Sequence, residues 1–373
     1  MRLLHIGCRH FRNLSEVQLA LAPKTTVLIG NNGQGKTNLL EAVFFLTTQK
    51  PLRAKRLREL IERGANSTRI ELDLEIGGAN RHVSVALDAY AKQLSVDGKR
   101  SNKLAEVLGP TPTVAFTPDD LWVVKGPPSA RRLLLDSAAT SRFPAFAAET
   151  RAFQRTLKSR NRLLKERSFA QLEVWNESLA RWGARIWVRR RRLLEEMQPR
   201  LQIVFGEMGP DWSRLHLRYA PLGNAAFFQN ADEEALAKAL LERLGAEQRH
   251  DVECGYTRVG PHTDDLEMAL GEMDARAFAS QGQTRAFALA WKVAEVANLE
   301  CMLGTSPALL LDDVSSELDP ERNAFLMRFI AQSQTQVLLT TTSANLVQTA
   351  ALGDSLWYQV CGGTFKPMAA PGG

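Results

Sequence analysis

The amino-acid sequence predicts an α/β protein in which a mixed sheet is joined by an antiparallel β portion and by a mainly helical second lobe. A glycine-rich loop at 30–37 separates the short apolar run 25–29 from an apolar helical pattern at 38–44. Apolar residues alternate with polar ones at 69–76, whereas 129–208 shows helical periodicity. Strand signals on both sides of a helical stretch indicate two lobes, the second one inserted in the first.

The glycine-rich loop has the phosphate-loop pattern of glycine, any four residues, glycine, lysine and threonine, between a strand and a helix. Glycines let the backbone turn its N–H groups toward phosphate oxygens, and the helix that follows adds a partial positive charge. Lys36 is placed to reach β- and γ-phosphates, and the Thr37 hydroxyl to bind Mg²⁺. We therefore expect a nucleotide to bind at Gly30, Asn31, Asn32, Gly33, Gln34, Gly35, Lys36 and Thr37.

The order of the predicted elements places the two lobes along the chain. Short strands are predicted within 3–29, and Asp97-Gly98 is the turn signal of a hairpin. Residues 1–128 and 250–373 are assigned to the nucleotide-binding lobe, and 129–249 to the helical lobe.

The helical lobe is predicted to form a short antiparallel arm of two helices, the first around Leu157. The second carries an apolar stripe with one missed turn near Arg189-Arg190, made of Trp175, Leu179, Trp182, Ile186, Leu193, Met197, Leu201 and Val204. The run Arg189–Arg192 predicts a solvated helix face, with a phosphate-binding face as the alternative.

Two carboxylates end an apolar strand in the second half of the chain. Asp312 and Asp313 follow Ala308–Leu311. Beside a phosphate loop, a carboxylate at a strand end is suited to Mg²⁺, and we assign this role to Asp312. Hydrolysis also needs a group that orients and polarises water, and we assign this role to Asp313.

Ser280 stands immediately before a predicted helix that begins at Gln281. Its hydroxyl and the N–H groups after it are suited to an anion, although an ordinary N-cap explains the same residue. Upstream of Ser280, His262 with Asp264 and Asp265 has the residue types of a metal cluster, but a turn is the preferred interpretation.

The composition of the chain limits its possible partners and its cellular location. The 373-residue chain has a formal net charge of +6, which makes a polyanionic partner plausible. Its four cysteines show neither zinc-site nor disulfide spacing, which indicates buried free thiols in a reducing compartment. Neither a signal peptide nor an apolar run long enough for a membrane span is visible, so we expect a cytoplasmic location and no membrane partner.

Several motifs together resemble the RecF family of bacterial recombination mediators, which are ABC-type ATPases related to SMC and Rad50 heads. The segment from Ser280 to Gln283 resembles the ABC signature, and the one from Ser316 to Asp319 resembles the D-loop. The gap between phosphate loop and signature is longer than in transporter ATPases and shorter than in proteins with a long coiled coil. The other matching stretches are His10–Asn13, Phe116–Leu121, Lys125-Gly126, Gly260–His262 with Asp264-Asp265, Asp312–Val314 and Thr340–Thr342.

The resemblance implies a weak DNA-stimulated ATPase that uses ATP and Mg²⁺ and dimerises with ATP. Ser280, Gly282 and Gln283 of one copy would then contact ATP held by the other, and Arg12 would reach the nucleotide unless it is a solvent-exposed strand-end arginine. The dimer would bind double-stranded DNA near single-strand gaps and, with RecO and RecR, promote RecA loading, replication restart and the SOS response. Such a protein would be nucleoid-associated when bound to DNA. The basic candidates for DNA contact are the arm arginines with Arg53, Lys55, Arg56 and Arg58.

Other functions stay open at this point. A Rad50- or SMC-like head would have a nuclease or kleisin partner. A small-molecule kinase would explain the phosphate loop but not the signature and D-loop matches. A non-hydrolysing DNA scaffold would bind ATP without turnover, against which the presence of Lys36, Asp312 and Asp313 argues.

Overall fold

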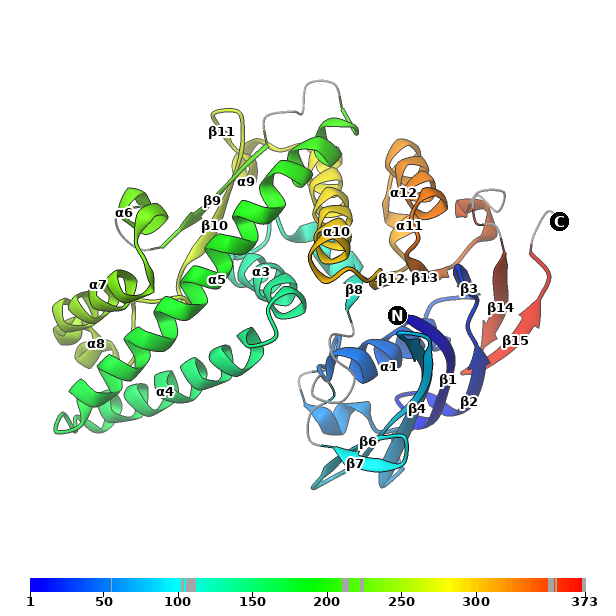
Figure 1. Ribbon diagram of the computed structural model, residues 1–373, viewed down its shortest axis with the longest axis horizontal. Helices are drawn as coiled ribbons and strands as arrows, with labels where there is room; N and C mark the ends of the chain where they lie inside the picture. Colours follow the sequence, from blue (N-terminus) through cyan, green and yellow to red (C-terminus); the bar gives the residue numbers. More distant parts are fainter. Residues whose placement is uncertain are drawn as a thin grey trace. The chain divides into compact units, whose positions relative to one another are not determined.

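The computed structural model describes residues 1–54, 56–101, 104, 112–209, 215–221, 225–347, 352 and 354–370. The chain divides into two compact units, the first formed by Met1–Leu121 with Arg285–Gly373 and the second by Trp122–Thr284 (Figure 1). The second unit therefore continues well beyond the boundary at 249 that the sequence predicted. The reason is a strand pairing between 215–220 and 265–270, which no local pattern reveals.

A mainly parallel sheet forms one layer of the first unit. In the described residues it has six strands in the order β15-β14-β3-β13-β12-β8. All pairs are parallel except that of β14 with β15. The fully buried strands β3, β12 and β13 each contain three or more consecutive apolar residues because both faces of a parallel sheet are covered. The bounds are β3 Thr25–Ile29, β8 Thr113–Phe116, β12 Ala308–Asp312, β13 Gln336–Thr341, β14 Ser355–Cys361 and β15 Thr364–Met368.

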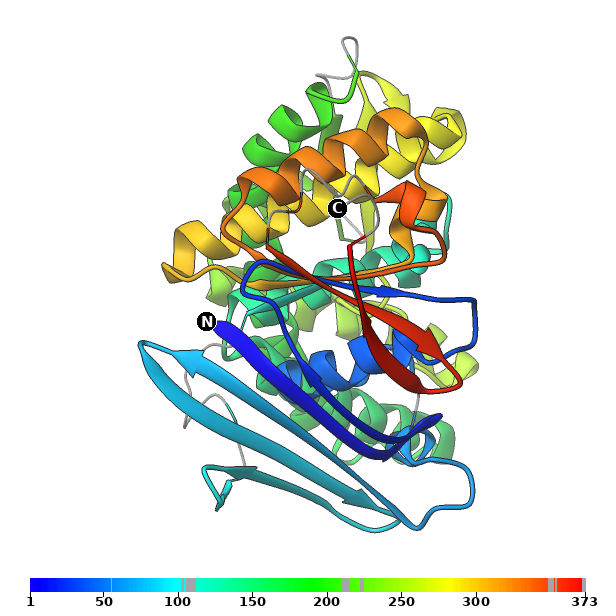
Figure 2. The ribbon, with the colours of Figure 1, turned by 90° about the vertical axis from the view of Figure 1, so that its right-hand side faces the viewer.

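An antiparallel sheet in the order β2-β1-β4-β5-β6-β7 forms a second layer of this unit. Helix α1 (Lys36–Thr48) lies between the two sheets (Figures 1 and 2). Residues on all sides of α1 are buried, so its apolar residues follow one another instead of forming a stripe. The predicted hairpin at Asp97-Gly98 is confirmed, with both residues at positive φ. The bounds are β1 Arg2–Phe11, β2 Leu14–Ala20, β4 Ser67–Ile76, β5 Ala79–Asp88, β6 Lys92–Val96 and β7 Lys99–Ser101.

Helices α10 (Gln281–Leu303) and α12 (Pro320–Gln332) cover the other face of the parallel sheet, α10 with its part beyond residue 284 (Figures 1 and 2). Asp319 and Pro320 have the residue types of an N-cap and a first helical position, and α12 begins there: the Asp319 side chain accepts a hydrogen bond from the Arg322 N–H, and Pro320 is the first helical residue. Shorter helical turns are η1 Leu57–Leu60, η2 Pro118–Trp122, α11 Val314–Glu317 and η3 Ala344–Leu346.

Two long helices of the second unit lie side by side and antiparallel, joined by a short loop (Figure 1). They are α4 (Phe146–Glu166) and α5 (Leu172–Gly206), and they confirm the predicted helical arm. Around them lie α3 Pro128–Arg142, α6 Ala225–Asn230, α7 Glu233–Ala246, α8 Gln248–Cys254 and α9 Ala275–Phe278. The antiparallel strands β9 Leu215–Ala220, β10 Asp265–Leu270 and β11 Met273–Asp274 form a small sheet.

The missed turn of the apolar stripe on α5 is filled by a buried arginine. Arg190 is only 3% exposed. Its guanidinium donates two hydrogen bonds to Asp136, at 2.7 and 2.9 Å, and one each to the Tyr219 hydroxyl and the Pro261 carbonyl, both at 2.7 Å. The prediction of a solvated helix face is therefore wrong at Arg190, which is part of the core because partners far along the chain neutralise it.

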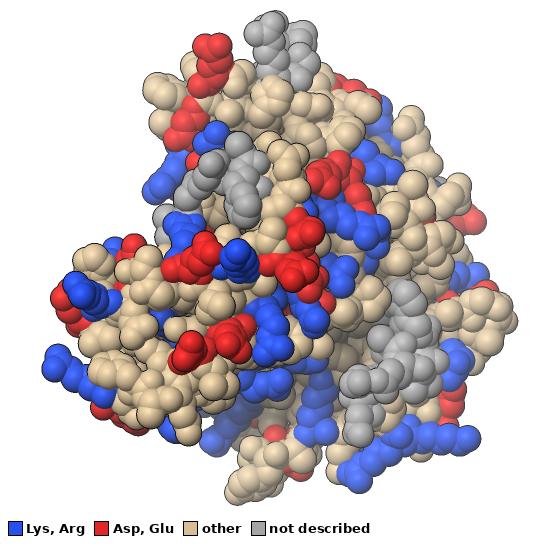
Figure 3. Space-filling model, turned by 60° about the vertical axis from the view of Figure 1, so that its left-hand side comes forward, with Lys and Arg blue, Asp and Glu red and all other residues tan. Residues whose placement is uncertain are grey.

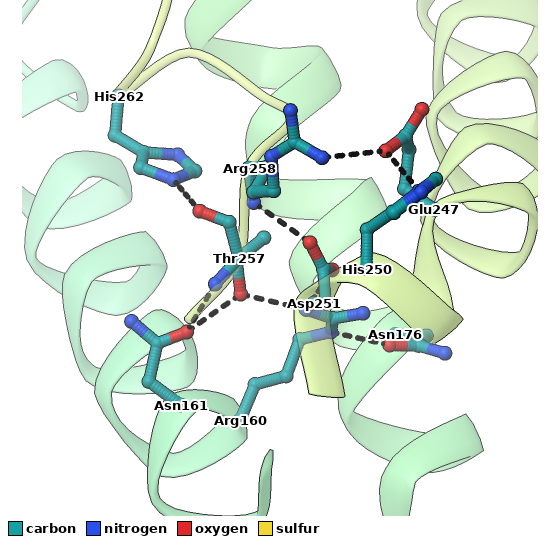
Figure 4. Close-up of polar contacts among 9 residues, drawn as sticks. All are labelled: Arg160, Asn161, Asn176, Glu247, His250, Asp251, Thr257, Arg258 and His262. Carbon is teal, nitrogen blue, oxygen red and sulfur yellow. Dashed lines mark hydrogen bonds and ion pairs between the residues drawn. The ribbon is translucent and has the colours of Figure 1, made fainter. Parts of the chain in front are cut away.

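A second buried arginine connects α4 to its neighbours (Figure 4). Arg160 donates to Asn176 on α5 at 2.6 Å and to Asp251 on α8 at 2.7 Å. It also donates at 2.7 Å to the Thr257 hydroxyl. The side chains of Arg160 and Asp251 are fully buried. This ion pair holds one face of α4 toward the interior of the unit.

The four cysteines are free, as expected, but only Cys8 is buried, whereas Cys254, Cys301 and Cys361 are exposed. The prediction of buried thiols is therefore wrong for three of the four. In the part of the chain that the structure describes, no helix is both long enough and apolar enough to cross a lipid bilayer.

Candidate nucleotide-binding site

The phosphate loop connects β3 to α1 in the first unit, as predicted. Two of its glycines meet strict backbone requirements. Gly35 has φ +109, and a Cβ there would lie 2.8 Å from Leu14. At Gly30 a Cβ would collide with the carbonyl oxygen of Val360 on β14. A side chain at either position would displace the loop.

Distant segments support the loop from outside. Asn13 donates to the Gly33 carbonyl at 3.2 Å. The turn of the C-terminal hairpin holds Gln34 through two backbone N–H groups, from Gly362 to its side-chain oxygen at 2.6 Å and from Gly363 to its carbonyl at 2.9 Å. Asn13 appeared in the sequence analysis only as a motif residue. The pair Gly362-Gly363 is a local hairpin signal, but nothing in the sequence connected that hairpin with the phosphate loop.

Lys36 is buried, and its ammonium donates to the carbonyl oxygens of Gly30, at 2.5 Å, and Asn31, at 2.9 Å. Burial lowers the pKa of Lys36, while Asp313 and Asp312 act in the opposite direction. The lysine thus lies at the base of the loop, held by backbone oxygens that phosphate oxygens can replace.

Thr37 and Asp312 meet although 275 residues separate them, because β12 is two strands from β3 in the same parallel sheet. The Thr37 hydroxyl donates to Asp312 Oδ1 at 2.6 Å, and the Thr340 hydroxyl donates to the same oxygen at 3.1 Å. Asp312 Oδ2 accepts from Arg53 at 2.6 Å. Arg53 therefore pairs with the Asp312 carboxylate, although the sequence analysis included it among the candidates for DNA contact.

Asp313 begins the turn into α11 with φ 52, a conformation that aspartate tolerates better than most residues. Its N–H donates to the Thr340 hydroxyl at 2.9 Å. Its buried Oδ1 has no hydrogen-bond partner among the described residues. Burial raises the pKa of Asp313, and the nearby carboxylates Asp312 and Glu317 add to this shift. The carboxylate is therefore a stronger base than an ordinary aspartate.

The oxygens at Thr37 and Asp312 fit Mg²⁺. Both are hard donors within hydrogen-bond distance of each other, and the carboxylate is almost fully buried. Mg²⁺ keeps several waters and takes only one or two protein oxygens at nucleotide sites, so a hydroxyl and one carboxylate suffice.

These residues surround a cavity of about 390 Å³. Six of the eight loop residues line it, but Gly30 and Asn31 contribute through the carbonyls that bind Lys36. The lining residues that sequence reasoning had not assigned to this cavity are Asn38, Arg53, Pro118 and Glu317. Asn38 follows the loop directly, which is a signal that could have found it.

Arg12 lies against α1. Its guanidinium pairs with Glu41 on α1 at 2.8 Å, and Arg12 does not line the cavity. Glu41 also accepts the backbone N–H of Arg53 at 2.9 Å. Both arginines are therefore connected to α1 through one buried carboxylate.

The signature segment belongs to the second unit. Ser280 is exposed at the start of α10. Its hydroxyl accepts the N–H of Gln283 at 3.2 Å, and the Gln283 side chain accepts the N–H of Ser280 at 2.9 Å. This capping box leaves the N–H groups of Gln281 and Gly282 pointing along the helix start.

His262, Asp264 and Asp265 do not form a metal cluster. Asp265 pairs with Arg131, Asp264 accepts hydrogen bonds from Trp187 and Tyr219, and His262 contacts the Thr257 carbonyl. No group of histidine, cysteine, aspartate and glutamate side chains in the described ranges has the geometry of a metal site. His262 lies in the turn 261–263, as preferred, whereas Asp265 begins β10.

Comparison with known proteins agrees with this geometry. Residues 2–360 match the family model of the RecF/RecN/SMC N terminal domain. The DNA replication and repair protein RecF of Myxococcus xanthus (strain DK1622) is 50% identical over 366 residues, which cover 97% of this chain and 96% of the relative.

Solved structures extend the comparison. The recombination mediator protein RecF-ATPrS in the RecFOR pathway is 29% identical with a TM-score of 0.88, covering 98% of each chain. An Smc head bound to the C-winged helix domain of ScpA has a TM-score of 0.57 at 16% identity, covering 100% of this chain and 98% of that one, which shows a shared fold. The chain therefore belongs to the RecF family of DNA replication and repair proteins, within the larger group of RecF, RecN and SMC head domains.

Proposed function

We propose that the protein is an ATP-driven, dimerising DNA-binding ATPase of recombinational repair. The observation that carries this proposal is the meeting of Thr37 and Asp312 at 2.6 Å beneath the phosphate loop. It brings together a phosphate cradle, a buried lysine and two carboxylates in one cavity, as nucleotide hydrolysis requires. The relatives named above supply the biological setting.

ATP binds with its β- and γ-phosphates over the loop. Lys36 exchanges the carbonyls of Gly30 and Asn31 for phosphate oxygens. Thr37 and Asp312 would hold Mg²⁺, which would supply positive charge to neutralise the phosphates. Asp313 accepts a proton from the attacking water, a task for which its raised pKa and unpartnered oxygen suit it. ATP hydrolysis is slow, is stimulated by DNA and serves as a switch.

A second copy of the chain completes the nucleotide site. Ser280, Gly282 and Gln283 present an exposed helix start to the γ-phosphate held by the other copy, and the helix dipole favours that charge. The exposed Phe278 next to this segment supplies apolar area for the same contact. ATP is then a cohesive part of the interface, and loss of the γ-phosphate weakens it.

The dimer binds double-stranded DNA near single-strand gaps, mainly through phosphates. With RecR and RecO as partners it promotes RecA loading and so supports replication restart and the SOS response. On the face shown in Figure 3, Lys and Arg side chains lie interspersed with Asp and Glu, so the net charge of +6 does not make that face uniformly basic. DNA contact therefore requires a local basic surface.

Light scattering tests the proposal directly. The molar mass of the protein is measured alone, with a non-hydrolysable ATP analogue, and with the analogue and a gapped duplex. We expect the mass to double with the analogue. Lys36→Ala should abolish nucleotide binding and dimerisation. Ser280→Arg should bind nucleotide and stay monomeric, while Ser168→Arg, a matched change at an exposed serine in the α4–α5 loop, should dimerise like the wild type.

A wild-type protein that stays monomeric when saturated with the analogue would contradict the proposal.

The release of inorganic phosphate measures the proposed ATP hydrolysis. We expect Asp313→Asn to lower turnover by about 10²–10⁴-fold, the usual contribution of a positioned general base. Undetectable turnover by the wild type would favour the non-hydrolysing scaffold, and capture of a nuclease in place of RecR would favour a Rad50-like head.

A further inference from the structure

Helix α4 carries a row of cations on the side that faces away from the interior of the second unit. All five members are exposed. They recur at alternating steps of four and three residues, which places them within about 80° of arc at 100° per residue. We call them the α4 stripe: Arg151, Arg155, Lys158, Arg162 and Lys165.

The buried ion pair shown in Figure 4 sets the direction of this stripe. Arg160 lies about 180° around the helix from Arg151, at the centre of the buried face of α4. Its hydrogen bonds to Asn176 and Asp251 prevent α4 from rotating about its axis. The stripe is therefore a fixed feature of the fold.

The stripe is almost without acidic partners. Among the described residues, the only carboxylate ion-paired with a member is Glu166, at 3.6 Å from Arg162, and both side chains are largely exposed. The other neighbours along the stripe are like charges at spacings of three and four residues, which destabilise a helix. A face that serves only solubility mixes both signs, as α7 does with Glu234, Lys238 and Glu242.

The arginines of α5 differ from the stripe because they bind within the protein. Arg189 pairs with Glu149, and Arg192 pairs with Glu196. Arg191 donates to the carbonyls of Phe228 and Ala231. Together with the buried Arg190, these side chains are engaged in holding the second unit together. On this arm the exposed cations that follow one another in a row are those of α4, whereas α5 adds the exposed Arg181.

A hollow of about 510 Å³ runs along the same helix. Three stripe members line it, Lys158, Arg162 and Lys165, together with the neutral side chains of Gln154, Leu157, Ser159 and Asn161. No carboxylate belongs to this lining. Amide and hydroxyl groups next to cations are suited to phosphate and sugar oxygens.

We propose that the α4 stripe binds the phosphate backbone of duplex DNA along one strand. This inference rests on the DNA-binding function proposed above and identifies its surface. Arg151 and Lys165 are separated by about 21 Å along the helix axis at 1.5 Å per residue. One DNA strand carries a phosphate per 3.4 Å of axis but winds around the duplex as it rises, so the stripe faces the few consecutive phosphates that lie on its own side of the duplex. These phosphate contacts involve no base, so we expect binding without sequence preference.

Salt titration of duplex binding tests the inference. The full-length protein, with the non-hydrolysable ATP analogue, is titrated against a fluorescent duplex by anisotropy between about 50 and 200 mM salt. The test variant replaces Arg155, Lys158 and Arg162 by glutamine. The control variant makes the same charge change at the exposed residues Lys99, Arg100 and Lys238. Each phosphate contact contributes about 0.9 to the slope of log affinity against log salt.

We expect the test variant to lose about 2.7 from the magnitude of that slope, at unchanged nucleotide binding and unchanged dimerisation without DNA. The control variant should keep the wild-type slope. Equal slopes for test variant and wild type would overturn the α4 assignment while leaving DNA binding itself intact, as would equal losses in both variants. A wild-type protein that does not bind the duplex would instead contradict the proposed function.

Discussion

Replacing Arg160 by methionine should destabilise the second unit strongly. The substitution keeps a long apolar side chain of similar reach but removes the guanidinium that donates to Asn176, Asp251 and Thr257. The Asp251 carboxylate is then left fully buried, with the N–H of Arg258 at 3.0 Å as its main remaining donor. The expected loss of stability comes from the uncompensated buried charge of Asp251 and not from missing packing.

The size of the effect follows from the burial. Breaking a buried pair by removing one partner costs about 3–5 kcal/mol, whereas an exposed substitution usually stays within about 0.5 kcal/mol. For a unit of this size, 1 kcal/mol corresponds to about 2–4 °C, so the melting temperature should fall by about 6–20 °C. Asp251→Asn in the Arg160→Met background should recover part of this loss, because the amide needs no counter-charge.

Thermal unfolding followed by circular dichroism and calorimetry measures these shifts, and calorimetry separates transitions when the two units unfold independently. Arg162→Met is the matched control, since Arg162 lies on the same helix with a side chain that is 74% exposed. Indistinguishable melting of the Arg160 and Arg162 variants would refute the reasoning. No recovery in the double variant would show that the buried charge is not the cause.

Two further outcomes are expected. Burial raises the pKa of Glu295 to about 7, while Lys292 opposes this shift and Asp120 adds to it. Protonation of Glu295 therefore stabilises the fold fully below pH 4.5, and this contribution to stability is lost as the pH rises through 7. Glu295→Gln should therefore raise the melting temperature relative to wild type more at about pH 8 than at about pH 5, and an equal difference at both pH values would contradict this. Arg53→Ala should lower the Mg²⁺ concentration needed for half-maximal binding of a fluorescent ATP analogue, because Arg53 competes for Asp312 at 2.6 Å; a higher requirement would show that Arg53 helps to hold the nucleotide.

The elements that sequence patterns predicted well are those specified by neighbouring residues. The phosphate loop, the strand ending in Asp312 and the capped start of α12 each depend on a few consecutive side chains and the backbone around them. Placing Asp312 beside Thr37 needed only the rule that parallel strands end at one edge of a sheet. Local chemistry was sufficient in these cases.

The failures share a different cause, which is dependence on residues far along the chain. Any analysis of apolar periodicity counts Arg190 as polar, and it is a core residue because Asp136, Tyr219 and Pro261 accept its hydrogen bonds. The boundary of the second unit was misplaced because β9 and β10 pair across a long sequence separation.

The phosphate loop gains its full set of supporting hydrogen bonds only when Gln34 contacts the turn at Gly362-Gly363. Chains are synthesised from the N-terminus, so the loop is made early and its last supporting residues are made late. Until β14 has paired with β3 and its hairpin has closed, the loop lacks both these N–H donors and the wall that Val360 provides. The phosphate loop therefore gains its last supporting contacts near the end of folding.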